Sequence, residues 1–133
     1  MIQRIQSLYI VSYIAIKIFL LYKSYIKKNL LSFLLNGFDL FSIVLIIILA
    51  ISIILLVSFK NRKNQIKILY FLILIQFMIL TSVSVLAFEE VNALKFLLNY
   101  QTLLYLLGFA LLLLALKGIK KDQNLIDSID RIR

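Results

Sequence analysis

LFSIVLIIILAISIILLVSF, residues 40–59, is the most apolar segment of the chain: sixteen of its residues are Leu, Ile, Val or Phe, and none is charged. An α-helix advances by about 1.5 Å per residue, so about 20 apolar residues match the hydrocarbon thickness of a bilayer. Each large apolar residue favours insertion by roughly 0.3 to 0.6 kcal/mol, which sums to about 5 to 10 kcal/mol here. We therefore expect a membrane-spanning helix over residues 39–59.

Three further apolar segments can span a bilayer on the same grounds. Residues 68–88 and 96–116 contain no charged residue and only a few polar ones. Residues 5–26 include Lys17, whose charge costs about 2.5 to 3.5 kcal/mol at the centre of a membrane. The apolar side chains of that segment favour insertion by roughly 3 to 7 kcal/mol, so we expect it to insert as well. A secretory signal peptide is the competing interpretation, but no small-residue cleavage site follows the apolar run.

The composition agrees with a membrane protein. The chain has 133 residues, which is enough for one domain. Of these residues 63% are hydrophobic, and the mean hydropathy is +1.04. A soluble domain of this length cannot hide so much apolar surface, because small domains bury only part of what the unfolded chain exposes. We predict an all-α fold: a four-helix transmembrane bundle over residues 1–118, with spans at about 5–26, 39–59, 68–88 and 96–116, and a short amphipathic C-terminal helix over residues 119–133.

The net charge of +9 comes from short basic clusters between the apolar segments. This pattern is typical of membrane-flanking anchors rather than of a nucleic-acid-binding surface, so we expect no nucleic-acid partner. Ten Lys and Arg residues flank the side that holds both chain ends, and four flank the other side. Cytoplasmic loops carry the excess of Lys and Arg, which predicts that both termini are cytoplasmic.

The C-terminal residues have an apolar face of their own. Gly118 is typical of the end of a helix, and we expect it to end the fourth span. Beyond it, apolar residues recur with helical spacing on one face, which comprises Leu125, Ile126, Ile129 and Ile132. A short amphipathic helix of this kind lies along the inner membrane surface or packs on a partner. We favour the interpretation in which the tail lies along the inner membrane surface. In the alternative, these four residues form a docking face for a partner.

Lys17 is the most unusual residue of the predicted spans, because an ionisable group within a membrane is a functional candidate. It lies on a polar helical stripe that also comprises Gln6, Tyr13, Ser24 and Lys28. This stripe could face the bundle and contact a substrate or the carboxylate of a partner. The simpler interpretation is a lysine whose long side chain extends to the membrane surface. We favour this second interpretation.

The later spans contain polar residues that can bond between helices. Gln76 lies near the middle of the third span, and Gln101 and Tyr105 share a face of the fourth with Gly108, which would admit a close neighbour. Hydrogen bonds between membrane helices contribute roughly 0.6 to 2 kcal/mol each. We expect Gln76, Gln101 and Tyr105 to stabilise helix packing rather than to line a transport path.

The sequence does not favour catalysis. It contains no Cys and no His, which excludes thiolate chemistry, disulfides and the usual zinc and haem ligands. We find no nucleophile with a base and an orienting group, and no phosphate-binding loop. We therefore expect no enzyme, no catalytic residue, no metal and no cofactor. The acidic pair Glu89 and Glu90 falls at the end of a span, not at its centre, which disfavours a proton relay.

The two ends of the chain carry a family resemblance. Residues 1–9 read MIQRIQSLY, and residues 120–133 contain KKD followed by Leu125, Ser128, Asp130, Arg131 and Arg133. Both resemble the signatures of an uncharacterised family of small four-span membrane proteins from Bacteroidota. The resemblance implies a bacterial inner-membrane protein with short cytoplasmic termini, and it implies no activity and no functional residue. The chain departs from those relatives in its short outer segments, its lack of Pro and its lysine within the first span.

These observations predict a small integral membrane protein without catalytic activity. Our leading hypothesis is a subunit or assembly factor that contacts lipid and either another membrane protein or further copies of itself. The alternative is a small oligomeric transporter or channel with Lys17, Gln76 and Gln101 along its path.

Overall fold

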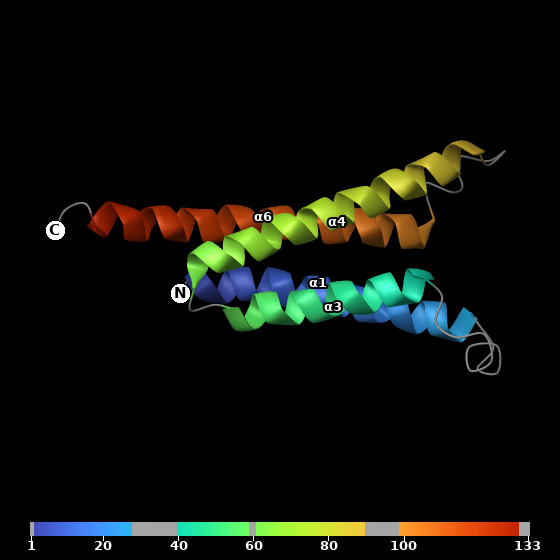
Figure 1. Ribbon diagram of the computed structural model, residues 1–133, viewed down its shortest axis with the longest axis horizontal. Helices are drawn as coiled ribbons and strands as arrows, with labels where there is room; N and C mark the ends of the chain where they lie inside the picture. Colours follow the sequence, from blue (N-terminus) through green and yellow to red (C-terminus); the bar gives the residue numbers. More distant parts are fainter. Residues whose placement is uncertain (1, 28–39, 59–60, 90–98, 131–133) are drawn as a thin grey trace.

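The computed structural model describes residues 2–27, 40–58, 61–89 and 99–130, and these form four helices (Figure 1). They are α1 (Ile2–Lys27), α3 (Leu40–Val57), α4 (Arg62–Glu89) and α6 (Tyr100–Asp130). No described residue belongs to a strand. The predicted all-α, four-helix fold is confirmed.

Consecutive helices run in opposite directions, and each packs against its neighbour in the sequence (Figure 1). Helix α6 also packs against α1, which closes the four helices into a ring. Helix α1 therefore faces α4 across the centre of the bundle. The start of α1 and the last turns of α6 lie at the same end of the bundle, which we name the terminal end (Figure 1).

Asparagines cap the starts of α4 and α6. The backbone oxygen of Asn61 accepts the N–H of Gln65 at 3.0 Å, and that of Asn99 accepts the N–H of Leu103 at 3.1 Å. The side-chain Oδ1 of Asn99 also accepts the N–H of Gln101 at 3.4 Å. Asparagine suits this position, because its side chain can replace a hydrogen-bond partner that the first turn of a helix lacks.

The outside of the bundle is apolar. Large apolar side chains are exposed on every helix, among them Val11, Ile18, Ile47, Ile54, Phe71, Leu74, Leu107 and Leu114. Such an exterior suits lipid rather than water. Within the described residues, three helices are long and apolar enough to cross a membrane, over Ile5–Lys23, Arg62–Val85 and Tyr100–Ile126. The apolar part of α3, Ile43–Val57, is shorter. The structure is that of a small membrane protein.

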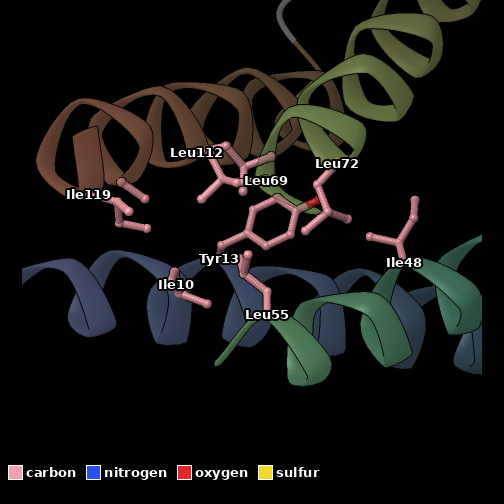
Figure 2. Packing of buried hydrophobic residues seen from close by; sticks show 9 residues of the cluster. Ile10, Tyr13, Ile48, Leu55, Leu69, Leu72, Leu112 and Ile119 are labelled. Carbon is pink, nitrogen blue, oxygen red and sulfur yellow. The ribbon is translucent and has the colours of Figure 1, made fainter. Parts of the chain in front are cut away.

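Side chains from all four helices fill the interior. Figure 2 shows the ring of Tyr13 in the middle of a cluster with Ile10, Ile48, Leu55, Leu69, Leu72, Leu112 and Ile119. Hydroxyl groups within the apolar segments bond to their own helices instead: Ser52 donates to the carbonyl of Ile48 at 2.6 Å, and Ser82 donates to that of Met78 at 2.9 Å. A hydroxyl satisfied in this way can lie in an apolar environment without a partner on another helix.

Two lysine–tyrosine contacts mark the ends of the apolar region. The Nζ of Lys120 lies 5.0 Å from the ring centroid of Tyr70 at the terminal end. At the opposite end, the Nζ of Lys23 lies 5.9 Å from the ring centroid of Tyr100. On α6, positions 100 and 120 are about 30 Å apart, which is the thickness of the hydrocarbon core. Tyrosine and lysine at this separation are typical of the two membrane–water interfaces.

Gly118 does not end the helix of the fourth span, contrary to our expectation, because α6 continues through it to Asp130. The reason lies in the neighbouring helix. A Cβ at Gly118 would be 2.8 Å from the Cγ of Gln6 in α1, so the glycine gives room for the Gln6 side chain. From there Gln6 donates to Asp122 at 2.8 Å. The C-terminal residues thus extend α6 instead of forming a separate helix.

Gly118→Ala should destabilise the bundle, because its Cβ would push the Gln6 side chain away from Asp122. In a Gln6→Ala background the same change should stabilise the protein by about 1 kcal/mol, because alanine is the better helix former and the clashing Cγ is absent. Thermal unfolding in detergent measures both effects. The same effect in the two backgrounds would contradict this account of Gly118.

Candidate functional site

A buried lysine lies at the centre of the bundle. Lys17 of α1 is fully buried, and its Nζ donates to the Oε1 of Gln76 in α4 at 2.7 Å. The same Nζ lies 5.2 Å from the ring centroid of Tyr13 and 4.7 Å from that of Tyr105 in α6. Three helices thus surround one ammonium group. We name Tyr13, Lys17, Gln76 and Tyr105 the central cluster.

Gln76 holds the central cluster together. Its Oε1 accepts hydrogen bonds from both Lys17 and the hydroxyl of Tyr13, the latter at 3.3 Å. Its Nε2 donates to the backbone carbonyl of Tyr105 at 3.0 Å. A carbonyl can only accept and an ammonium can only donate, so the orientation of the Gln76 amide is determined by its partners. One side chain therefore connects α4 to both α1 and α6.

The central cluster lies well inside the apolar region. Lys17 is about 9 Å along α1 from Lys23, which marks one interface, and Gln76 is about 9 Å along α4 from Tyr70, which marks the other. No carboxylate of the described residues contacts Lys17. Its positive charge is instead stabilised by an amide oxygen and by two aromatic faces, whose quadrupoles attract cations.

The interpretation that Lys17 extends to the membrane surface is wrong. Its ammonium bonds inward to Gln76, and its side chain is fully buried. Gln6 and Tyr13 are buried on the same face of α1, so the polar stripe faces the bundle. The hydrogen bond explains why the side chain points inward. A lysine extends to the membrane surface when no acceptor is within reach, whereas here the Oε1 of Gln76 accepts from Lys17.

The structure brings together three of the four predicted intramembrane polar residues: Lys17, Gln76 and Tyr105. Gln101, one turn before Tyr105 on α6, is only partly buried, and no side-chain hydrogen bond among the described residues joins it to the other three. Gly108 admits a close neighbour, as expected, because a Cβ there would be 3.3 Å from the Cε2 of Tyr13. The face of α6 that meets α1 and α4 therefore includes Tyr105 and Gly108 but not Gln101.

A second polar cluster lies at the terminal end, and sequence reasoning did not find it. Gln6 donates to Asp122 at 2.8 Å and accepts from the Nη1 of Arg62 at 3.1 Å. Arg62 also forms an ion pair with Asp122 at 3.7 Å. The cluster joins α1, α4 and α6, as the central cluster does. The sequence gives only a weak signal for this cluster, because Asp122 follows Gly118, a residue typical of the end of a helix.

The predicted docking face of the tail is described only in part. Leu125 and Ile126 are exposed on α6, 48% and 44% of each residue being accessible. The side chain of Ile129 and the whole of Ile132 lie outside the described part of the chain. The tail is also not a separate helix along the surface, because Figure 1 shows it continuing α6 beyond the ends of α1 and α4.

The two polar clusters offer hydrogen bonds and charge. In the described residues, no group of three or more acidic, Cys or His side chains could hold a metal ion. The Gln76 amide and the Tyr13 hydroxyl bond within the central cluster. Such an arrangement can fix three helices in register, because each bond that is broken would leave a polar group in an apolar interior.

Four antiparallel helices, an apolar exterior and a polar centre define the protein as a small helical membrane protein. The chain matches the model of a domain of unknown function, DUF4293, over residues 2–132, and it belongs to that family. The expected membership of an uncharacterised family is thereby confirmed. No curated protein and no solved structure matches the chain.

Gln76→Leu should destabilise the bundle by about 3 kcal/mol, because the Nζ of Lys17 would lose the amide oxygen to which it donates. Adding Lys17→Met should recover much of this loss, since the buried charge is then removed. Unfolding in detergent measures the changes. Gln101→Leu is the matched control and should change stability by less than about 0.5 kcal/mol. Equal losses for Gln76→Leu and Gln101→Leu would contradict the role of the central cluster.

Proposed function

We propose that this protein is a non-catalytic subunit or assembly factor of a membrane complex, and that the extension of α6 binds its partner. In this proposal the chain crosses a bacterial inner membrane four times and has both termini in the cytoplasm. The observation that carries the proposal is the continuity of one buried face of α6 beyond the bundle. That face meets α1 and α4 along the bundle, and no other described helix covers it where α6 projects past them (Figure 1).

The spacing of this face is regular. Its buried members recur three or four residues apart: Tyr105, Gly108, Leu112, Ala115, Ile119 and Asp122. The next position in the series is Ile126, which is exposed, and Leu125 is exposed beside it. Apolar residues repeating every three or four positions pack against another helix. We therefore infer that a helix of a partner covers Leu125 and Ile126, as α1 and α4 cover the residues before them.

The continuity of α6 supports a protein partner more than a position flat on the membrane. Helix α6 is continuous past the interface marked by Lys120, so Ile126 lies about 9 Å further out along the helix axis. A surface helix would need a break near Gly118 to turn into the membrane plane, and α6 has none. An apolar face that leaves the bilayer is exposed to water unless a partner covers it.

The alternative, a small transporter or channel, would use Lys17, Gln76 and Gln101 as its path. Lys17 and Gln76 are fully buried and bonded to each other, whereas Gln101 is only partly buried. Such a path would require the central cluster to open, with the loss of several hydrogen bonds in an apolar interior. The closed arrangement favours the docking role.

The proposed orientation can be tested with single cysteines, because the chain contains no Cys of its own. Lys23→Cys and Asn61→Cys place thiols at exposed positions at opposite ends of the bundle. In intact cells a membrane-impermeant maleimide should label residue 23, whereas residue 61 should react only after the inner membrane is permeabilised. Labelling of both residues from the same side, or the reverse pattern, would contradict the proposed topology.

The docking role predicts that Leu125→Glu or Ile126→Glu releases the partner. A buried apolar contact replaced by a charge should weaken the complex at least about tenfold. The measurement is gentle extraction of the tagged protein, with mass spectrometry to determine what accompanies it and in what ratio. Asn124→Glu is the matched control, because it adds the same charge at an exposed polar neighbour.

A protein at fixed stoichiometry that stays with wild type and Asn124→Glu, and leaves with Leu125→Glu, supports the proposal. If the molecules that are lost with Leu125→Glu are further copies of the chain, the complex is a homo-oligomer. Extraction of wild type as a monomer, or complexes that survive Leu125→Glu and Ile126→Glu, would contradict the docking role.

A further inference from the structure

We propose that the outer side of the α4–α6 pair, at the terminal end, binds the phosphate headgroup of an anionic phospholipid. The site consists of five exposed lysines around one tyrosine, which we name the lysine surface: Lys63, Lys67, Tyr70, Lys117, Lys120 and Lys121. Lys121 lies one turn before Leu125 on α6, but the lysine surface shares no residue with the docking face at Leu125 and Ile126. The inference does not depend on the proposed function.

Helical register brings these lysines to one place. On α4, Lys63, Lys67 and Tyr70 are four and then three residues apart, so they share one face. On α6, Lys117, Lys120 and Lys121 share a face in the same way. The two faces meet where the Nζ of Lys120 lies over the ring of Tyr70, 5.0 Å from its centroid. Since α4 and α6 pack together, Lys63 and Lys67 on α4 and Lys117 and Lys121 on α6 are within about two helical turns of this contact along their helices.

No acidic side chain of the described residues neutralises the lysine surface. Asp122 is on α6 beside Lys121, but its carboxylate points into the bundle, where it binds Gln6 and Arg62. None of the five lysines forms an ion pair within the described part of the chain. Like charges this close repel one another unless an anion is present. The carboxylate of Asp122 is thus bound inside the bundle, and the five exposed lysines can bind an external anion.

The depth of the lysine surface matches a lipid phosphate. Tyr70 and Lys120 mark the interface at the terminal end, and the other lysines lie within about 10 Å of it along their helices. Lysine ammonium groups at this depth lie at the level of the headgroups, with their carbon chains along the apolar helix surface. The tyrosine is suited to the same level, since its ring is apolar and its hydroxyl can bond to a phosphate oxygen.

The test is native mass spectrometry of the full chain in micelles that contain equal amounts of phosphatidylglycerol and phosphatidylcholine. Wild type should retain phosphatidylglycerol in clear preference to phosphatidylcholine. Each of Lys67→Gln and Lys120→Gln should reduce that preference about fivefold, and the pair about twentyfold, because one lysine near an anionic headgroup contributes a factor of this order. The double variant Lys67→Arg with Lys120→Arg should retain the preference.

Lys23→Gln is the matched control, because Lys23 contacts Tyr100 in the same way at the other end of the bundle. It should leave the preference unchanged. The inference is overturned if wild type shows no preference, if Lys67→Gln with Lys120→Gln keeps it, or if Lys23→Gln removes as much of it. Millimolar inorganic phosphate should not displace the bound lipid; complete displacement would mean that the surface binds soluble phosphate and would overturn the assignment to lipid.

Discussion

An ammonium group that cannot reach water must obtain its hydrogen bonds and its compensating charge from the protein, and Lys17 imposes this requirement on the whole bundle. Its Nζ is 2.7 Å from the Oε1 of Gln76, and the rings of Tyr13 and Tyr105 face it. These groups come from α1, α4 and α6, so the three helices have to meet at one depth. A shift of any one of them would leave a charge or an amide without a partner in an apolar medium, where this costs several kcal/mol.

The rest of the structure follows the same division between a polar interior and an apolar exterior. In lipid, apolar side chains gain little by leaving the solvent, so packing and interhelical hydrogen bonds hold the helices together. The central cluster and the Gln6–Arg62–Asp122 cluster provide such bonds at two depths. Gly108 and Gly118 let α6 approach the side chains of Tyr13 and Gln6 at these two depths. Each polar cluster is therefore paired with a glycine that allows close contact.

Helix α6 links the interior of the bundle to its surroundings. One face of it packs against α1 and α4 and continues to Ile126 beyond them, and another face contributes Lys117, Lys120 and Lys121 to the lysine surface. A partner helix on the first face and an anionic lipid beside the second would both act on the same rigid element. The chain belongs to the DUF4293 family, a domain of unknown function, so the family assigns no activity to either face of α6.

The sequence by itself determined that the chain is a small helical membrane protein. Long apolar runs such as residues 40–59 are stable as helices in lipid, whereas in water they would expose a large apolar surface. It also identified Lys17, Gln76 and Tyr105, since polar groups within such runs are few and conspicuous. Helical periodicity placed Gln6, Tyr13 and Lys17 on one face of α1. Only the tertiary structure decided that this face turns inward and that Gln101 is only partly buried. It also decided that α6 continues through Gly118, which brings Asp122 to Gln6 and Arg62. The physical reason is that spacing along one helix is local, whereas a hydrogen bond between helices depends on their relative depth and rotation, which only the packed bundle determines.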